Sequence, residues 1–188
     1  ITNKNIMYLH SANLQGKNVV LRCDYNVPLK NGKILSTKRI DASIDTLNYI
    51  LNNGFNRLVI ISHLGRPKGE DPSLSLLPVK DYLQSILNRN VFLCGLNEFD
   101  SNPEISSYLD CNIILLENIR YYKEETKLIE NKTDEFRNKL SKLGDVFIND
   151  AFGCCHRAHS SIVGINIQER YLGFIVEREL KYLNIFTQ

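Results

Sequence analysis

The sequence predicts an α/β fold in which a doubly wound, mostly parallel sheet forms the middle of three layers, with helices on both of its faces. Short runs rich in Val, Ile and Leu alternate along the chain with longer segments whose apolar residues recur every three or four positions. Strands that alternate with helices favour parallel pairing. The apolar runs are continuous, as expected of strands that are covered on both faces.

Composition limits the classes of protein that this chain can represent. It has 188 residues, of which 43% are hydrophobic and 23% charged, which is typical of a globular protein with one large domain. The net charge of +2 is too small for a general attraction to nucleic acid or membranes, so a cationic site must come from local clustering of arginines. No run of about 18 apolar residues indicates a membrane span, and residues 1–16 lack the core of a signal peptide. The five cysteines are odd in number and show no Cys-x-x-Cys spacing, which favours a reducing cytoplasm.

The first third of the chain contains a strand, a hairpin and a helix. Residues 1–16 are expected to form a loosely packed arm before a strand at 19–21. An Asn-Gly pair predicts a tight hairpin over residues 29–34. Apolar residues at spacings of four, three and four predict one helix from about 38 to 53, which ends before Gly54.

The later elements follow the same alternation. Strands are predicted at residues 58–61, 91–93, 113–116 and 146–148, and helices are predicted to begin at Pro78, at a Thr133 cap and at Ile175. The last helix runs to Phe186. Three segments are expected to be less regular: one short helix within 95–110, a solvated charged loop at 121–132 and a connection at 164–173.

Polar and cationic side chains follow four of the predicted strands, at the point where each strand ends. They are Asp24 and Asn26, then His63 and Arg66, then Arg120, and finally Arg157. The carboxyl ends of parallel strands meet at one edge of the sheet, where ligands of open α/β folds bind. Arg39 lies in the first turn of a predicted helix, where the helix dipole disfavours a cation, so it hints at an anionic partner.

This set of side chains suits a small and highly anionic substrate. Guanidinium groups bind phosphate and carboxylate in a bidentate manner, while Asp24 and Asn26 would bind hydroxyls. No Gly-x-Ser-x-Gly nucleophile is present, so the expected reaction depends on positioning and charge stabilisation, as phosphoryl transfer does. No Gly-x-x-x-x-Gly-Lys-Ser/Thr or Gly-x-Gly-x-x-Gly loop is present either, so a nucleotide would have to be supplied from elsewhere.

Each of these residues, taken alone, also has an interpretation without a binding role. Asp24 and Asn26 are common in turns, Arg39 could be a solvated arginine, and His63 could be a structural histidine. His156 and His159, with Cys154 or Cys155, could also bind a metal, but the chain has no further ligand cluster with zinc spacing, so no metal site is expected.

Four segments resemble the motifs of the phosphoglycerate kinase family, in the order and spacing of that family. They are residues 22–29 (Arg-Cys-Asp-Tyr-Asn-Val-Pro-Leu), 62–69 (Ser-His-Leu-Gly-Arg-Pro-Lys-Gly), 116–122 (Leu-Glu-Asn-Ile-Arg-Tyr-Tyr) and 149–159 (Asn-Asp-Ala-Phe-Gly-Cys-Cys-His-Arg-Ala-His). The family has two Rossmann-like domains. The resemblance implies that residues 1–171 are the N-terminal phosphoglycerate-binding domain and that 172–188 begin the interdomain helix. The C-terminal domain, which binds Mg-ADP or Mg-ATP, is then absent from this chain.

The resemblance also implies a role for each residue at the strand ends. The residues that would hold 3-phosphoglycerate or 1,3-bisphosphoglycerate are Asp24, Asn26, His63, Arg66, Arg120 and Arg157. Arg39 would stabilise the phosphoryl group in flight and so be catalytic, while Tyr25, Leu64 and Gly65 would line the site through their backbone. The whole protein is then expected to be a cytoplasmic, monomeric phosphotransferase that acts on a carboxyl group in the ATP-forming step of glycolysis. The 188 residues alone are expected to be inactive.

A second hypothesis is a non-catalytic module that binds phosphate-bearing anions without turnover, which the missing nucleotide motifs favour. A third, nucleic-acid binding, is weakened by the small net charge and by the lack of a basic stripe with aromatic residues.

Overall fold

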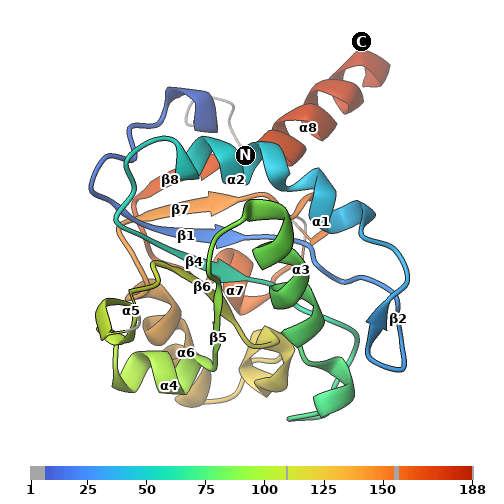
Figure 1. Cartoon of the computed structure of the whole chain (residues 1–188), viewed down its shortest axis with the longest axis vertical. Helices are drawn as coiled ribbons and strands as arrows, with labels where there is room; N and C mark the ends of the chain where they lie inside the picture. Colours follow the sequence, from blue (N-terminus) through green and yellow to red (C-terminus); the bar gives the residue numbers. More distant parts are fainter. Residues whose placement is uncertain (1–6, 109, 155–156, 188) are drawn as a thin grey trace.

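The computed structural model describes residues 7–108, 110–154 and 157–187. Six parallel strands form its central sheet, in the spatial order β5-β6-β4-β1-β7-β8 (Figure 1). They are β1 (Asn18–Arg22), β4 (Arg57–Ile61), β5 (Phe92–Cys94), β6 (Ile113–Leu116), β7 (Val146–Asn149) and β8 (Glu169–Leu172). A separate antiparallel hairpin consists of β2 (Leu29–Lys30) and β3 (Lys33–Ile34). The predicted α/β class with a parallel sheet is therefore confirmed.

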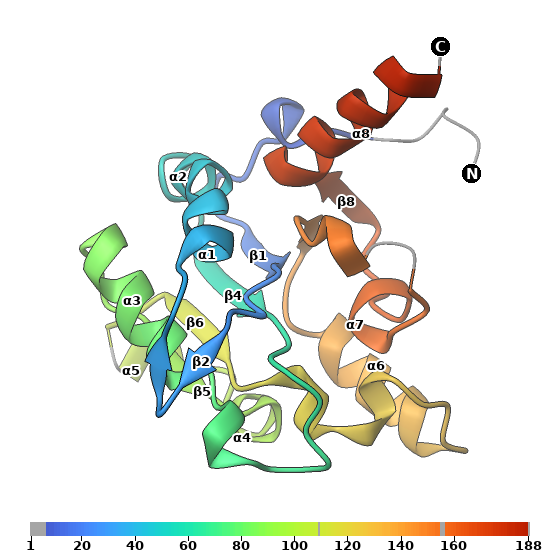
Figure 2. The same ribbon diagram turned by 90° about the vertical axis from the view of Figure 1, so that its right-hand side faces the viewer.

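Helices cover both faces of this sheet, which gives the three predicted layers. On one face lie α1 (Lys38–Ala42), α2 (Ile44–Leu51) and α3 (Leu77–Leu87), and on the other lie α4 (Leu96–Ser101), α5 (Ile105–Tyr108) and α6 (Lys132–Ser141). Figure 2 shows α1 to α3 on one side of the sheet and α6 with the short α7 (Ser160–Val163) on the other. The last helix, α8 (Phe174–Thr187), extends away from the body (Figure 1). Within the described ranges, no helix has the length and apolarity to cross a bilayer.

Strand side chains alternate between two separate hydrophobic cores. Val19 and Leu21 of β1 belong to the core under α1, α2 and α3, whereas Val20 between them belongs to the core under α6. In β4, Leu58 belongs to the first of these cores and Val59 to the second, and all these side chains are fully buried. Burial on both faces explains why these strands are continuous apolar runs.

The segment predicted as one helix over 38–53 is two helices, because the helix is interrupted by a turn at Ser43. The Ser43 hydroxyl donates to the Ile40 carbonyl over 2.7 Å, and the Ser43 amide donates to the same carbonyl over 3.0 Å. A serine that bonds back to its own helix competes with the regular ladder. The Ser43 hydroxyl also lies 2.8 Å from the Tyr25 hydroxyl, so a contact from outside the helix fixes this break.

Two segments that were expected to be irregular or loose belong to the sheet and the core. Residues 164–173 contain β8, which the period-two pattern does not reveal because only Tyr171 of its four residues is buried. Arg170 of β8 packs its guanidinium 4.6 Å from the centre of the Phe147 ring. The described part of the N-terminal arm, residues 7–16, is not loosely packed, since Leu9 and Leu14 are fully buried.

Smaller differences concern the ends and number of elements. Residues 95–110 contain two short helices, α4 and α5, in place of one. Thr133 is not a helix cap, because α6 begins one residue earlier; its hydroxyl accepts from the Ile129 amide over 2.7 Å and closes the preceding loop. The charged loop at 121–132 is not solvated throughout, because Glu125 is buried.

Gly144, between α6 and β7, has no room for a side chain. A Cβ atom there would lie 2.5 Å from the Asn18 carbonyl oxygen and 2.9 Å from Val20 Cγ2. We expect Gly144→Ala to lower the free energy of unfolding by about 1–3 kcal/mol, because the backbone of β1 would have to move. Urea denaturation measures this change.

Gly95→Ala is the matched control, since its Cβ would meet no atom closer than 3.7 Å. An equal loss of stability in both variants would contradict the steric argument.

Candidate functional site

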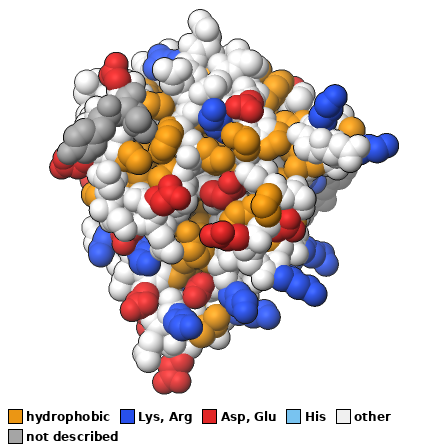
Figure 3. Space-filling view, turned by 60° about the horizontal axis from the view of Figure 1, so that its bottom comes forward, with side chains coloured by type: hydrophobic (Ala, Val, Ile, Leu, Met, Phe, Trp, Pro, Cys, Tyr) orange, Lys and Arg blue, Asp and Glu red, His pale blue; other side chains and the backbone are white. Residues whose placement is uncertain are grey.

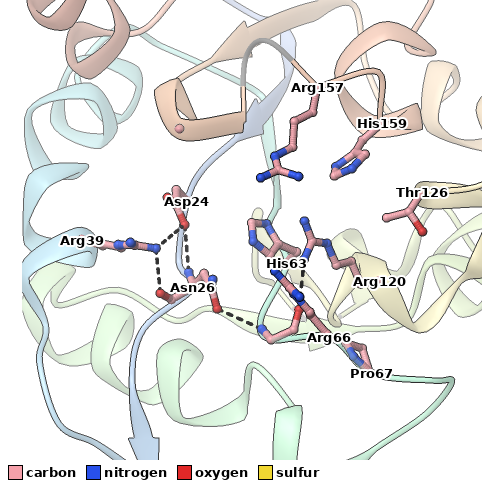
Figure 4. A pocket seen from close by; sticks show the side chains of 12 residues that line it. Asp24, Asn26, Arg39, His63, Arg66, Pro67, Arg120, Thr126, Arg157 and His159 are labelled. Atoms are coloured by element: carbon pink, nitrogen blue, oxygen red, sulfur yellow. Dashed lines mark hydrogen bonds and ion pairs between the residues drawn. The ribbon is translucent and has the colours of Figure 1, made fainter.

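A cleft of about 600 Å³ opens at the carboxyl ends of β1, β4, β6 and β7. The residues that line it are Asp24, Asn26, Arg39, His63, Gly65, Arg66, Pro67, Arg120, Thr126, Gly153, Arg157 and His159. Figure 4 shows that Arg66, Arg120 and Arg157 approach His63 from different segments. The described residues that line the cleft include four arginines and one carboxylate, that of Asp24, so the cleft is strongly cationic.

Most of the residues predicted at the strand ends lie together in this cleft, but two do not. Tyr25 and Leu64 are buried outside it. Their backbone amides are already bonded within the protein: the Tyr25 amide donates to Ser62 Oγ over 2.9 Å, and the Leu64 amide donates to Asn118 Oδ1 over 3.1 Å.

Four lining residues were not among the predicted site residues. Thr126, Pro67 and Gly153 carried no signal of their own, although the last two lie within motif segments. His159 was considered only as a metal ligand, but it lines the cationic cleft. Of its suggested metal partners, Cys155 and His156 lie outside the described residues. Within the described residues, no group of three or more His, Cys, Asp or Glu could hold a metal.

Arg39 is held at the mouth of the cleft by two neighbours from the loop after β1. Its Nη1 lies 3.3 Å from Asp24 Oδ1 and donates to the Asn26 carbonyl over 2.9 Å (Figure 4). The Asn26 amide also donates to Asp24 Oδ1, over 3.1 Å. Over half of the Arg39 side chain is exposed, so this pair adds little stability; it orients the guanidinium beside the cleft.

The loop after β4 is tied to its neighbours at Gly65. The Gly65 amide donates to Asn26 Oδ1 over 2.9 Å, and Arg120 Nη1 donates to the Gly65 carbonyl over 3.1 Å. Gly65 has a φ of +62°, and a Cβ there would lie 2.9 Å from a methyl group of Leu74. Both conditions favour glycine, which lets the loop lie close to the cleft.

Asn118 holds three loops of the site together from a fully buried position. Its Oδ1 accepts from the amides of Leu64 and Arg120, both over 3.1 Å. Its Nδ2 donates to the Leu64 and Leu74 carbonyls, over 2.7 Å and 2.9 Å. One amide side chain therefore connects the loop after β4, the loop before α3 and the loop after β6.

His63 is a neutral imidazole in this cationic site. It is 4% exposed, and burial, together with the charges of Arg22 and Arg120, lowers its pKa to about 3. Burial and the charges of Arg120 and Arg157 also lower the pKa of His159. Both shifts follow from the expense of adding another positive charge to a partly desolvated cationic cleft.

Asp150 connects the sheet to the start of α8. Its Oδ1 accepts from the Ile175 amide over 2.9 Å, in the first turn of that helix. The residue is 1% exposed, and burial raises the pKa of its carboxyl group to about 6. Gly173 allows this approach, since a Cβ there would lie 2.2 Å from Asp150 Oδ1.

Comparison with known proteins assigns the chain to one family. The phosphoglycerate kinase family model matches residues 9–188. The chain belongs to the phosphoglycerate kinase family. It is 45% identical to phosphoglycerate kinase from Dictyostelium discoideum in an alignment that covers 95% of this chain and 46% of that protein. It is 42% identical to the enzyme from Euplotes crassus, over 91% of this chain and 44% of that protein.

Solved structures of the family share the fold. Phosphoglycerate kinase from Coxiella burnetii superposes with a TM-score of 0.79 at 32% identity, covering 96% of this chain and 44% of that one. The chain thus spans somewhat less than half the length of the relatives that it matches, and it corresponds to the N-terminal half of the family.

We expect Asn118→Ala to lower the free energy of unfolding by about 2–4 kcal/mol, because it leaves several buried amides and carbonyls without partners. Chemical denaturation measures the loss. Asn112→Ala is the control: its side chain is exposed and donates one bond, to the Asn56 carbonyl over 3.2 Å, so it should change stability by less than about 0.5 kcal/mol. Equal effects of the two substitutions would contradict the connecting role of Asn118.

Asp150 should make the stability depend on pH. The folded chain binds the Asp150 proton more tightly than the unfolded chain does, because burial raises the pKa of this carboxyl group from 3.8 to about 6. The contribution of Asp150 to the free energy of unfolding therefore falls by roughly 2 kcal/mol as the pH rises across that range. Asp150→Asn should remove this fall, and Asp45→Asn, at an exposed acid, should keep it. Urea titrations across this pH range test the expectation, which fails if Asp150→Asn and the unchanged chain have the same slope.

Proposed function

We propose that this chain is the substrate-binding half of a phosphoglycerate kinase and that its cleft binds 3-phosphoglycerate or 1,3-bisphosphoglycerate. One observation carries the proposal: Arg39, Arg66, Arg120 and Arg157 surround a neutral His63 in a cleft with one described carboxylate. Such a site attracts a ligand with several negative charges and repels cations. Membership of the phosphoglycerate kinase family supports this substrate class.

Different lining residues would bind different groups of the ligand. The planar guanidinium groups of Arg66, Arg120 and Arg157 suit the phosphate and carboxylate oxygens of the ligand. Asp24 and Asn26 accept hydrogen bonds, so they suit the ligand's hydroxyl group. His63 donates a hydrogen bond without adding a charge.

Arg39 is the proposed catalytic residue. It lies at the more exposed mouth of the cleft and is oriented by Asp24 and the Asn26 carbonyl. A fixed cation at this position would stabilise charge on a phosphoryl group as it passes to or from the substrate carboxylate. The chemistry needs no nucleophile from the protein, which agrees with the residues that line the cleft.

The cleft does not fit a magnesium nucleotide. Magnesium requires oxygen ligands, whereas arginines dominate the lining, and the Asp24 carboxylate is paired with Arg39. We therefore propose that Mg-ADP or Mg-ATP binds to a domain outside these 188 residues, and that the chain alone is inactive. Residues 1–171 would form the substrate domain and 172–188 the start of an interdomain helix, within a monomeric, cytoplasmic enzyme of glycolysis.

A non-catalytic anion-binding module is the second candidate, because the sequence has neither of the two glycine-rich nucleotide-binding loop motifs. Nucleic-acid binding has less support. The face in Figure 3 carries acidic, basic and apolar side chains interspersed, with no continuous basic surface.

Isothermal titration of 3-phosphoglycerate into the chain tests the proposal. We expect saturable binding, and we expect Arg66→Ala to weaken it about 10- to 100-fold through loss of a charge-assisted contact. Arg89→Ala is the matched control, because Arg89 is also exposed but lies outside the cleft. Mg-ADP should give no binding heat.

If Arg89→Ala weakens the binding of 3-phosphoglycerate as much as Arg66→Ala does, the cleft is not the binding site. No binding to a folded chain would reject the proposed substrate. If the acid binds but turnover is absent even when a nucleotide-binding half from a relative is added, the non-catalytic module is favoured.

A further inference from the structure

We propose that Arg22, Ser161 and Glu125 position His63, so that its Nε2–H is a fixed, uncharged hydrogen-bond donor to the ligand in the cleft. None of these three residues lines the cleft, and all are fully or almost fully buried. They come from β1, from α7 and from the 3₁₀ helix η5 (Lys123–Glu125). The inference deepens the proposed function by naming positioning residues for the same site.

The first link is the contact between Arg22 and His63. Arg22 ends β1 and is 0% exposed. Its Nη2 lies 3.2 Å from His63 Nδ1, and its Nη1 donates to the Cys23 carbonyl. A guanidinium only donates hydrogen bonds, so Nδ1 of His63 must accept. A neutral ring that accepts at Nδ1 carries its proton on Nε2.

The second link holds Arg22 in place. Arg22 Nε donates to Ser161 Oγ over 2.9 Å. The Ser161 hydroxyl then donates its own proton to Glu125 Oε2, over 2.5 Å, while Glu125 Oε1 accepts from the Ser161 amide over 2.7 Å. Ser161 therefore joins the buried cation to a buried carboxylate, and each bond has one consistent direction.

The third step is the charge balance beneath the cleft. Arg22 is a fully buried cation, and Glu125 lies nearby at 1% exposure. Burial raises the pKa of the Glu125 carboxyl group, whereas the charge of Arg22 and the two hydrogen bonds from Ser161 favour its ionised form, which balances the charge of Arg22. A buried cation without compensation would be strongly unfavourable. With Glu125 in place, Arg22 can remain charged while its field, together with burial, keeps His63 neutral.

The functional consequence is preorganisation. Without Arg22, a neutral imidazole could place its proton on either nitrogen, and the ring could rotate. With Arg22 at Nδ1, the donor at Nε2 is set before the ligand arrives, so no reorganisation is needed on binding.

Nitrogen-15 NMR of the histidine-labelled chain at neutral pH tests the proposal directly. In the unchanged chain, we expect the shift of an unprotonated acceptor for Nδ1 of His63 and that of a protonated nitrogen for Nε2. In Ser161→Ala, both shifts should move toward each other, because Arg22 has lost the acceptor for its Nε and the ring samples both tautomers. Binding of 3-phosphoglycerate should weaken about tenfold, as for one lost oriented hydrogen bond.

Ser160→Ala is the matched control. Ser160 is adjacent, equally buried and also bonded to an arginine: its hydroxyl accepts from Arg137 Nε over 3.1 Å and donates to the Glu124 carbonyl over 2.6 Å. It has no link to His63, so its substitution should leave the His63 nitrogen shifts unchanged.

Glu125→Gln is the second variant, used also if Ser161→Ala does not fold. Its amide would donate to Ser161 Oγ in competition with Arg22, so the His63 shifts should move in the same direction. Unchanged His63 shifts in a folded Ser161→Ala or Glu125→Gln chain, or equal movement in Ser160→Ala, would overturn the positioning role. Shifts that behave as expected in a chain that does not bind 3-phosphoglycerate would reject the proposed substrate and leave the positioning role standing.

Discussion

The parallel register of β1 with its two neighbours decides where the charged groups of this protein lie. Arg22, at the end of β1, is level with Ile61 of β4 on one side and Asn149 of β7 on the other. The loops that follow these strands therefore begin at the same height and in the same direction. A slip of one residue would turn each side chain to the opposite face, and so move the side chains of each packed core into the other core.

This arrangement concentrates positive charge at one edge of a chain that is nearly neutral overall. The protein limits the resulting repulsion in two ways: it keeps His63 neutral, and it places Asp24 beside Arg39 and Glu125 near Arg22. Of the remaining cations in the cleft, Arg66 and Arg157 are exposed, and Arg120 donates to the Gly65 carbonyl. A polyanionic ligand would relieve their mutual repulsion, so folding and ligand recognition depend on the same electrostatics.

The sequence predicts much of this architecture because strand composition and the position of strand ends are local signals. The continuous apolar run of residues 113–116 and the polar residues after each strand belong to this class. Other features depend on contacts that no local pattern contains. Glu125 looks like one more residue of a charged loop until Ser161, 36 residues later, packs against it. Likewise, β8 is half polar because it lies at the edge of the sheet, and the break between α1 and α2 involves a contact of Ser43 with Tyr25, 18 residues earlier in the chain.

The loop after β4 has no regular secondary structure, yet side chains take up the hydrogen bonds that a sheet would provide. The Leu64 amide is bonded to Asn118, and the Gly65 amide to Asn26. Such amides exchange with solvent deuterium only when their hydrogen bonds to the supporting side chains break. The amides of this loop should therefore exchange slowly, like those of a strand. Its conformational entropy has been lost during folding, so a ligand of the cleft would meet a surface that is already ordered.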